Sequence, residues 1–504
     1  MLKVKEKGGS LTAHVSWLML AKTLAFAFNV ALPVVVVRKL DLLHFGQYKT
    51  LFLLIATSVA ILQFGFGMSA YYYLPREPDR QPEVILNIFA FNTVLGGLAC
   101  AGLMLWPSLL GRLFDQPALT GYARLMGVVI LFWTISSALE IIPIANGEMK
   151  LASALIISVQ LTRTVMYVAA VIIFGTVRAL MYAAVIQGFL QTAVLWWYLQ
   201  SRFGVFWRRF DGPLLRQQLS YAVPLGVAGV LYTVQTDLHS FFVTNRLGAA
   251  AFAIYSVGTV QLPLTTLLQE ATNAVLIPRV SYLQHINDAR EIISLIARSM
   301  RKLAAVYFPM YALLMTVANE LIGFVYTRRL LPAVPVFRIN LTLLIVSILL
   351  QDPLFRAYKE QRFFLIRLRV LTCTLLVAGL WYGTSRFGPV GAITTVVIVS
   401  VIERTVTAIR FGRILGVGWK DIGQLKDVGK LALAAAAAGV AAALVRVPLL
   451  EAKPLVILLV CGVVFSLVYL AAVLLLQIMT PEEKSSVNLG RTLGLRRPPR
   501  PPSC

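Results

Sequence analysis

The chain has 504 residues, of which 58% are hydrophobic and only 13% are charged. Soluble globular proteins have about 45–50% apolar and about 25% charged residues, so this composition excludes an ordinary soluble enzyme. The 46 Lys and Arg residues outnumber the 22 Asp and Glu residues, which gives a formal net charge of +24. The basic residues lie between apolar runs and not in one block, so we expect a polytopic membrane protein without a nucleic-acid partner.

Fourteen apolar segments are long enough to cross the roughly 30 Å hydrocarbon core of a membrane as helices. The first follows Lys3, Lys5 and Lys7, as a secretory signal would, but its apolar run is too long for a signal and we expect it to remain as a span. The fourteen segments predict an all-α membrane protein. In chain order they cover residues 11–37, 45–74, 84–106, 119–145, 151–176, 178–201, 217–243, 249–277, 302–326, 333–355, 364–385, 388–410, 430–447 and 455–479.

The distribution of Lys and Arg among the connections predicts the orientation of the chain. Thirty of them lie on the side of the N-terminus and ten on the opposite side. Because cytoplasmic loops are enriched in Lys and Arg, we expect both termini in the cytoplasm. Residues 279–301 have the pattern of an amphipathic helix on the inner membrane surface. The basic, proline-rich residues 480–504 are expected to form a disordered cytoplasmic tail.

Short motifs recur between the two halves of the chain, which indicates an internal repeat. Phe45 and Tyr48, for example, recur 207 residues later as Phe252 and Tyr255. Coincidence among similar loops is the alternative explanation. A true repeat of six spans predicts two bundles related by an axis along the membrane normal, as in transporters that rock one half against the other. The predicted parts are an N-terminal six-helix bundle (1–201), a cytoplasmic linker (202–216), a C-terminal six-helix bundle (217–412) and two additional transmembrane helices (413–479).

The segment from Arg38 to Tyr48, RKLDLLHFGQY, resembles a motif of polysaccharide flippases. These are the Wzx-like proteins of the polysaccharide transporter family, within the multidrug/oligosaccharidyl-lipid/polysaccharide exporter superfamily. Asp41 departs from the motif, because the family commonly has glycine there. The resemblance covers about residues 10–480, and fourteen spans is the family's usual number. It also includes residues 221–224, Asp237 and residues 245–248, which resemble the opening of the family's second half, and residues 277–281, which resemble its P-R-L-S turn.

This resemblance implies a flippase that moves undecaprenyl-diphosphate-linked oligosaccharide from the inner to the outer leaflet of the bacterial inner membrane by alternating access. Its expected role is surface polysaccharide biosynthesis, that is, of O-antigen, capsule or exopolysaccharide. The implied partners are the lipid-linked oligosaccharide, the lipid bilayer, and polysaccharide polymerase and chain-length proteins. We expect neither an enzyme nor a metal site.

Charged residues near the middle of spans are candidate functional residues, because each costs about 2.5–3.5 kcal/mol on insertion scales. Lys22 and Arg163 are the candidates for binding the diphosphate in a cationic, water-filled cavity. A Lys ammonium acts as a point charge, and an Arg guanidinium can bind two phosphate oxygens at once. The structural alternative for both is a salt bridge, Lys22 with Glu270 or Arg163 with Glu140.

Further polar residues of the spans have other candidate roles. Asp237, Glu270 and Gln63 are candidates for coupling to Na⁺ or H⁺ or for lining the cavity. The membrane potential alone is an alternative driving force, because it favours outward movement of an anion by about 2.3 kcal/mol per charge per 100 mV. A further group lies nearer the inner ends of the spans and is expected to form an inner gate or to contact lipid headgroups: Glu140, Asp352, Arg356, Glu403 and Arg404.

Two other functions remain open. An ion-coupled multidrug or small-molecule antiporter of the same superfamily should have an acidic pocket for cations, whereas these spans carry at least as many basic as acidic groups. A membrane polysaccharide polymerase or ligase generally needs a sizeable external loop, and the predicted outer loops are short. The sequence has no G-x-x-x-x-G-K-[ST] loop, which argues against an ATP-driven exporter.

Overall fold

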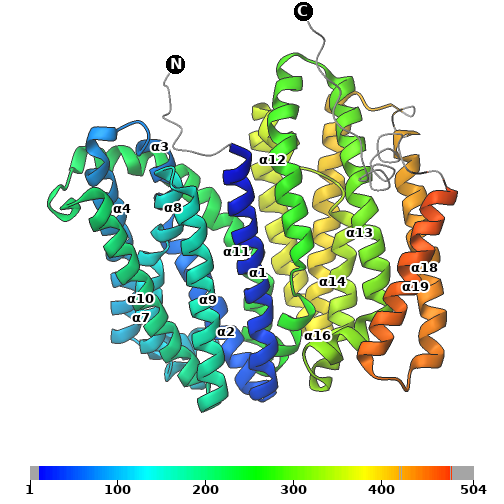
Figure 1. The fold of residues 1–504 in the computed structure, drawn as a ribbon, viewed down its shortest axis with the longest axis horizontal. Helices are drawn as coiled ribbons and strands as arrows, with labels where there is room; N and C mark the ends of the chain where they lie inside the picture. Colours follow the sequence, from blue (N-terminus) through cyan, green and yellow to red (C-terminus); the bar gives the residue numbers. More distant parts are fainter. Residues whose placement is uncertain (1–10, 419–420, 422, 477, 479–504) are drawn as a thin grey trace, which may run out of the picture. The chain divides into compact units, whose positions relative to one another are not determined.

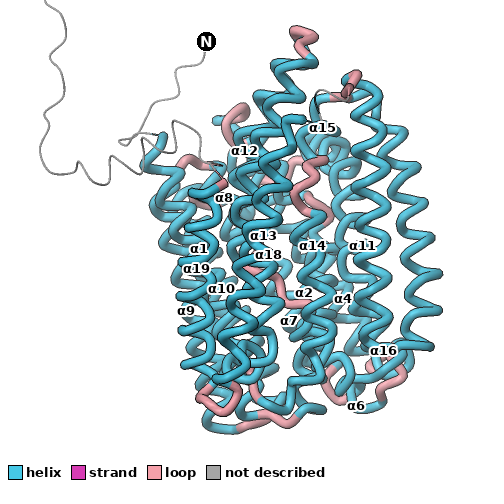
Figure 2. The backbone as a smooth tube through the Cα atoms, turned by 90° about the vertical axis from the view of Figure 1, so that its right-hand side faces the viewer, coloured by secondary structure: helices cyan, strands magenta, loops and turns pink. Residues whose placement is uncertain are grey.

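The computed structural model describes residues 11–418, 421, 423–476 and 478, and these residues contain helices but no strand (Figure 2). The predicted all-α membrane class is thereby confirmed, whereas the predicted tail 480–504 lies outside the described residues. The α-helices and the short 3₁₀ helices (η) are α1 (Leu11–Lys39), α2 (Leu42–Gln63), η1 (Phe66–Met68), α3 (Ser69–Tyr73), η2 (Pro78–Arg80), α4 (Gln81–Leu105), α5 (Ser108–Leu113), α6 (Pro117–Thr120), α7 (Ala123–Ser136), α8 (Ala138–Ala145), α9 (Met149–Phe174), α10 (Val177–Phe203), η3 (Phe206–Arg208), α11 (Gly212–Gly258), α12 (Pro263–His285), α13 (Ala289–Val325), η4 (Arg328–Ala333), α14 (Val334–Val346), α15 (Asp352–Ala357), η5 (Lys359–Gln361), α16 (Arg362–Leu415), η6 (Gly423–Leu425), α18 (Lys426–Arg446), η7 (Val447–Leu449) and α19 (Pro454–Leu475).

Within the described residues, ten helices are long and apolar enough to cross a membrane, and α11 with α12 adds an eleventh candidate as a bent pair. Helices α11 and α16 are each too long for one crossing. Helix α16 has 54 residues, which corresponds to about 80 Å at 1.5 Å per residue. Non-helical backbone at Gly388 in α16 and at Gly248 in α11 divides each of them into two helices. The break at Gly248 falls between two predicted spans, and the break at Gly388 falls on the first residue of the predicted span 388–410. The total of fourteen stays a prediction.

Polar side chains fix where several helices begin. The carboxylate of Asp41 accepts a hydrogen bond from the His44 backbone N–H (2.7 Å) at the start of α2. Thr176 accepts from the Ala179 N–H at the start of α10, at 3.2 Å. Such caps satisfy backbone donors that have no partner inside the helix. Asp41, where the resembled family has glycine, therefore has a structural role.

The described helices belong to two compact units. The first comprises Met1–Leu267, Val325–Asn340 and Leu368–Val399, and the second comprises Leu268–Phe324, Leu341–Arg367 and Ser400–Cys504. These units cut across the predicted boundary at 202–216. The division into two six-helix bundles therefore stays a prediction.

In the first unit, helices that are distant in sequence pack side by side. Helix α1 packs along α9, α4 packs along α7, and α10 contacts both α7 and α9 (Figure 1). The predicted linker 202–216 is folded onto these helices, because Phe206 is fully buried. Three ion pairs attach it: Arg202 with Glu148 at 3.0 Å, Arg209 with Glu83 at 3.8 Å, and Asp211 with Arg80.

Helices α2 and α11 form a long antiparallel contact in the first unit. A Cβ atom on Gly46 would lie only 1.9 Å from the backbone oxygen of Ala249, so glycine is required for the two backbones to approach this closely. Between the ends of this contact, the buried hydroxyls of Thr50 and Thr244 are hydrogen-bonded at 2.8 Å. Small side chains and interhelical hydrogen bonds are the usual means of helix association in membranes.

In the second unit, the last two helices are attached to α13. Helices α18 and α19 pack against each other (Figure 1). Glu320 of α13, which is buried, accepts two hydrogen bonds from the Arg446 guanidinium of α18, at 2.9 and 2.8 Å. The Tyr469 hydroxyl of α19 donates to the backbone oxygen of Ala305 at 3.0 Å. The additional helices are therefore packed onto the preceding helix.

Residues 279–301, which are predicted to form one amphipathic helix on the inner membrane surface, are divided between two helices in the structure. The first of these residues end α12, and a short turn at Asn287, which has a φ of 56°, separates them from α13. The remaining residues are the beginning of α13, which continues without interruption through Arg301 into the predicted ninth span. The amphipathic pattern thus belongs to the ends of two long helices.

Candidate functional site

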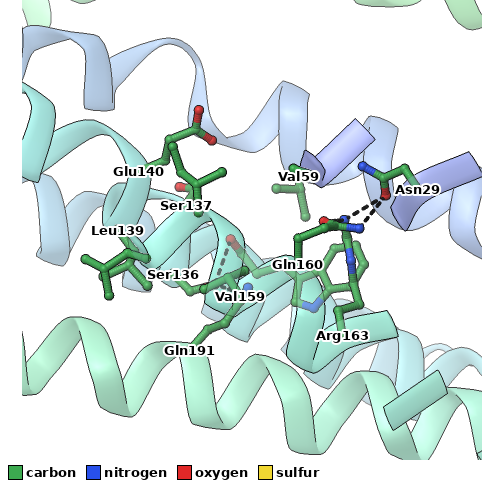
Figure 3. A pocket seen from close by; sticks show the side chains of 14 residues that line it. Asn29, Val59, Ser136, Ser137, Leu139, Glu140, Val159, Gln160, Arg163 and Gln191 are labelled. Carbon is green, nitrogen blue, oxygen red and sulfur yellow. Dashed lines mark hydrogen bonds between the residues drawn. The ribbon is translucent and has the colours of Figure 1, made fainter. Parts of the chain in front are cut away.

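A polar cavity of about 430 Å³ lies among the helices of the first unit (Figure 3). Helices α1, α2, α7, α8, α9 and α10 all contribute side chains to its wall. Two of these, Arg163 and Glu140, are sequence-predicted candidates. The lining residues are Ala25, Asn29, Val59, Trp133, Ser136, Ser137, Leu139, Glu140, Leu155, Ile156, Val159, Gln160, Arg163 and Gln191.

Arg163 is held by uncharged side chains (Figure 3). Its Nη2 donates to Gln160 Oε1 at 2.6 Å and to Asn29 Oδ1 at 3.2 Å. Gln160, which is buried and one helical turn away on α9, also donates from Nε2 to Asn29 Oδ1 at 2.8 Å. The guanidinium carbon lies 5.4 Å from the centroid of the Trp133 ring, within cation–π range. This arrangement orients the cation while leaving its charge in place.

No ion pair of the described residues includes Arg163. The alternative prediction of a salt bridge between Arg163 and Glu140 is therefore wrong. The two side chains lie toward different ends of the cavity (Figure 3). The chemistry of an unneutralised guanidinium in a cavity between apolar helices suits an anionic ligand, and phosphate binding by Arg163 stays a prediction.

The Glu140 end of the cavity carries hydroxyl and amide groups. The Ser136 hydroxyl donates to Gln191 Oε1 at 3.1 Å, and the Ser137 hydroxyl donates to the backbone oxygen of Thr134 at 2.7 Å. Glu140 itself is exposed. The cavity therefore combines a cation at one end with a carboxylate and neutral hydrogen-bonding groups at the other.

Lys22, the second predicted phosphate ligand, lies in α1, one turn before the cavity residue Ala25. Its side chain is outside the part of the chain that the structure describes. Its role and its alternative pairing with Glu270 therefore stay predictions.

The three candidates for ion coupling are in different places. Asp237 in α11 accepts a hydrogen bond from the Thr57 hydroxyl of α2 at 2.5 Å, so it is part of the contact between these two helices. Gln63 is the last residue of α2 and is half-buried. Glu270 is exposed on α12 and belongs to the second unit. Coupling by these residues stays a prediction.

Four of the five predicted inner-end residues lie in the second unit, whereas Glu140 lines the cavity of the first. Asp352 accepts from Asn273 Nδ2 at 3.2 Å, and Arg356 is exposed near the end of α15. Glu403 and Arg404 both contact the turn after α14. The side chain of Gln351 donates to the buried Glu403 carboxylate at 3.4 Å, and Arg404 donates to the backbone oxygen of Leu349 at 2.8 Å. Arg404 also lines an apolar cavity of about 210 Å³.

The residues that hold Arg163 are uncharged, so a search for charged residues within the spans does not find them. Uncharged amides in apolar helices would have been a usable signal, since a buried amide needs hydrogen-bonding partners. Asn29, Gln160 and Gln191 are uncharged amides within apolar helices, and Gln160 is buried.

Comparison with known proteins identifies a family and a fold. The family model described as "Polysaccharide biosynthesis protein" matches residues 35–335. A structure of the lipid II flippase MurJ, in an inward closed conformation, has a TM-score of 0.62 and 13% sequence identity, covering 94% of this chain and 99% of that chain. No curated protein matches this sequence.

Two other transporter structures are similar in fold. An inward-facing multidrug resistance MATE family transporter of the MOP superfamily has a TM-score of 0.61 and 14% identity, covering 83% of this chain and 97% of that chain. A MOP superfamily transporter from Pyrococcus furiosus, described as having a binding pocket of reverse polarity, has a TM-score of 0.57 and 14% identity, covering 81% of this chain and 96% of that chain. These similarities show a MOP transporter fold for this chain.

Proposed function

This chain belongs to the polysaccharide biosynthesis protein family, and we propose that it is a flippase for undecaprenyl-diphosphate-linked oligosaccharide in the bacterial inner membrane. The family predicted from the sequence is thereby confirmed. The proposed flippase moves its substrate from the inner to the outer leaflet by alternating access, with both termini in the cytoplasm. The observation that carries the proposal is the Arg163 guanidinium, whose acceptors among the described residues are amide oxygens and which faces a polar cavity.

In this proposal Arg163 binds the diphosphate, and Lys22 adds a second positive charge from α1. The guanidinium suits this role because it can donate two parallel hydrogen bonds to phosphate oxygens. Gln160 and Asn29 keep it oriented without neutralising it. The unneutralised cation at the Arg163 end of the cavity supports the flippase over a multidrug antiporter, because cationic drugs would need an acidic group there.

Transport in sealed vesicles tests the proposal. Purified protein is reconstituted with a fluorescent lipid-linked oligosaccharide, and the sidedness of the label is followed with a membrane-impermeant quencher. Arg163→Gln should lower the rate by about tenfold to a hundredfold, since hydrogen bonds to charged groups contribute about 1.5–3 kcal/mol. Arg178→Gln is the matched control, because Arg178 is exposed and lies outside the cavity.

An unchanged rate for Arg163→Gln would remove the proposed phosphate role. A change of oligosaccharide length without a change of sidedness would identify a polymerase. Uptake of cationic drugs against an ion gradient, without movement of the lipid-linked sugar, would identify an antiporter.

A further inference from the structure

The Arg163 cavity has two chemically different ends. At one end, Asn29 and Gln160 hold the guanidinium. At the other end, the Glu140 carboxylate lies near two serine hydroxyls and Gln191 (Figure 3). Arg163 and Glu140 do not pair with each other, although both line one cavity of about 430 Å³.

Hydrogen-bonding capacity at the Glu140 end is not used up by neighbouring residues. None of the hydrogen bonds or ion pairs found among the described residues involves the Glu140 carboxylate. Gln191 accepts from Ser136 through Oε1, which leaves its NH₂ group for a ligand. A carboxylate is an acceptor, so its natural ligand partner is a group that donates, such as a hydroxyl or an amide N–H.

Size further restricts the ligand. Small-molecule pockets of about 300–1,000 Å³ enclose most of one compact ligand, so this cavity can take a single ring with its phosphate and is too small for a lipid-linked oligosaccharide. Trp133 adds an aromatic ring to the wall, which combines an apolar face with a polar N–H.

We propose that the cavity recognises one glycosyl phosphate unit of the substrate, with the phosphate on Arg163 and hydroxyl or N–H groups of the attached sugar donating to Glu140. This inference rests on the proposed function, and it assigns the choice of sugar to Glu140 and Gln191. A site built to hydrogen-bond a ligand's OH or NH groups discriminates strongly against ligands that lack them.

Calorimetric titration of the full-length protein in nanodiscs tests this assignment. The probes are a panel of hexose and N-acetylhexosamine 1-phosphates, the corresponding free sugars, and inorganic phosphate. At least one glycosyl phosphate should bind about tenfold or more tightly than inorganic phosphate. Glu140→Gln should abolish that preference but still bind inorganic phosphate, which also shows that the variant is folded. Arg163→Gln should weaken binding of both ligands.

The control variant is Asp427→Asn, which removes a carboxylate on α18, outside the cavity. It should keep the full preference. A panel in which no glycosyl phosphate exceeds inorganic phosphate would overturn the assignment, and so would a preference that survives in Glu140→Gln.

Flipping and sugar recognition can fail separately. If the vesicles show normal flipping while Glu140→Gln keeps the wild-type preference, the sugar assignment is wrong and the flippase stands. If the protein moves no lipid-linked sugar but loses its glycosyl phosphate preference in Glu140→Gln, the binding site stands and the flippase proposal is wrong.

Discussion

The contact between α2 and α11 gives a sharp prediction about stability. An alanine at position 46 would place its Cβ 1.9 Å from the Ala249 oxygen, whereas ordinary contacts of this kind begin at 3.4 Å. The two helices would have to separate by roughly 1.5 Å, and overpacking of this kind typically costs about 1–3 kcal/mol. The same separation would break the buried Thr50–Thr244 hydrogen bond, at about 0.5–1.5 kcal/mol. We therefore expect Gly46→Ala to lose about 1.5–4.5 kcal/mol.

Gly97→Ala is the matched control in α4. Nothing lies within 4 Å of a Cβ at this position, so the substitution should stabilise the helix by about 0.5–1 kcal/mol. The free energies of unfolding can be compared by titration of mixed micelles with SDS, followed by tryptophan fluorescence. If both variants unfold at the same SDS fraction, α2 and α11 do not approach each other as closely as the structure shows.

Three further predictions concern polar contacts. Arg446→Met should destabilise the protein by about 3–5 kcal/mol, because it leaves the buried Glu320 carboxylate without its partner. The double variant with Glu320→Met should regain most of that loss in the same SDS titration; a double variant as unstable as the single one would contradict this. The Asp211 carboxylate accepts hydrogen bonds from the Leu214 N–H and from Arg80. These bonds, the Leu214 bond more than the Arg80 bond, hold the pKa of Asp211 below its ordinary value of 3.8. The start of α11 should therefore keep its protection against hydrogen exchange at neutral pH and lose it as the pH falls through that lowered pKa, whereas Asp211→Asn should show no such acid transition. Tyr469→Phe should cost about 0.5–1.5 kcal/mol in thermal unfolding, through loss of its hydrogen bond to the α13 backbone, and an unchanged melting temperature would argue against that bond.

Hydropathy predicts where this chain is helical, because each span needs a long apolar segment. It also predicts a break close to Gly388, which is followed by Pro389 and is the first residue of the predicted span 388–410. The packing of α1 against α9 could not be predicted, because lipid and neighbouring helices are similarly apolar and the pattern does not distinguish the two faces.

The residues of the candidate site are also only partly predictable from the sequence. Arg163 is identified by its charge within an apolar span. The neutral residues that orient it come from two helices, α1 and α9, whose pairing is visible only in the fold. For this reason the alternative of a salt bridge with Glu140 is wrong, whereas the sequence does predict that Arg163 lines a polar cavity.

The attachment of α18 to α13 has a consequence for biogenesis. Glu320 precedes Arg446 by 126 positions in the chain. At about 5–20 residues per second of synthesis, the ribosome takes about 6–25 s to supply the arginine after the glutamate has been made. During that interval α13 has a carboxylate whose counter-ion does not yet exist. A nascent or truncated protein that stops short of α18 should therefore remain recognisable to membrane proteases as unfinished.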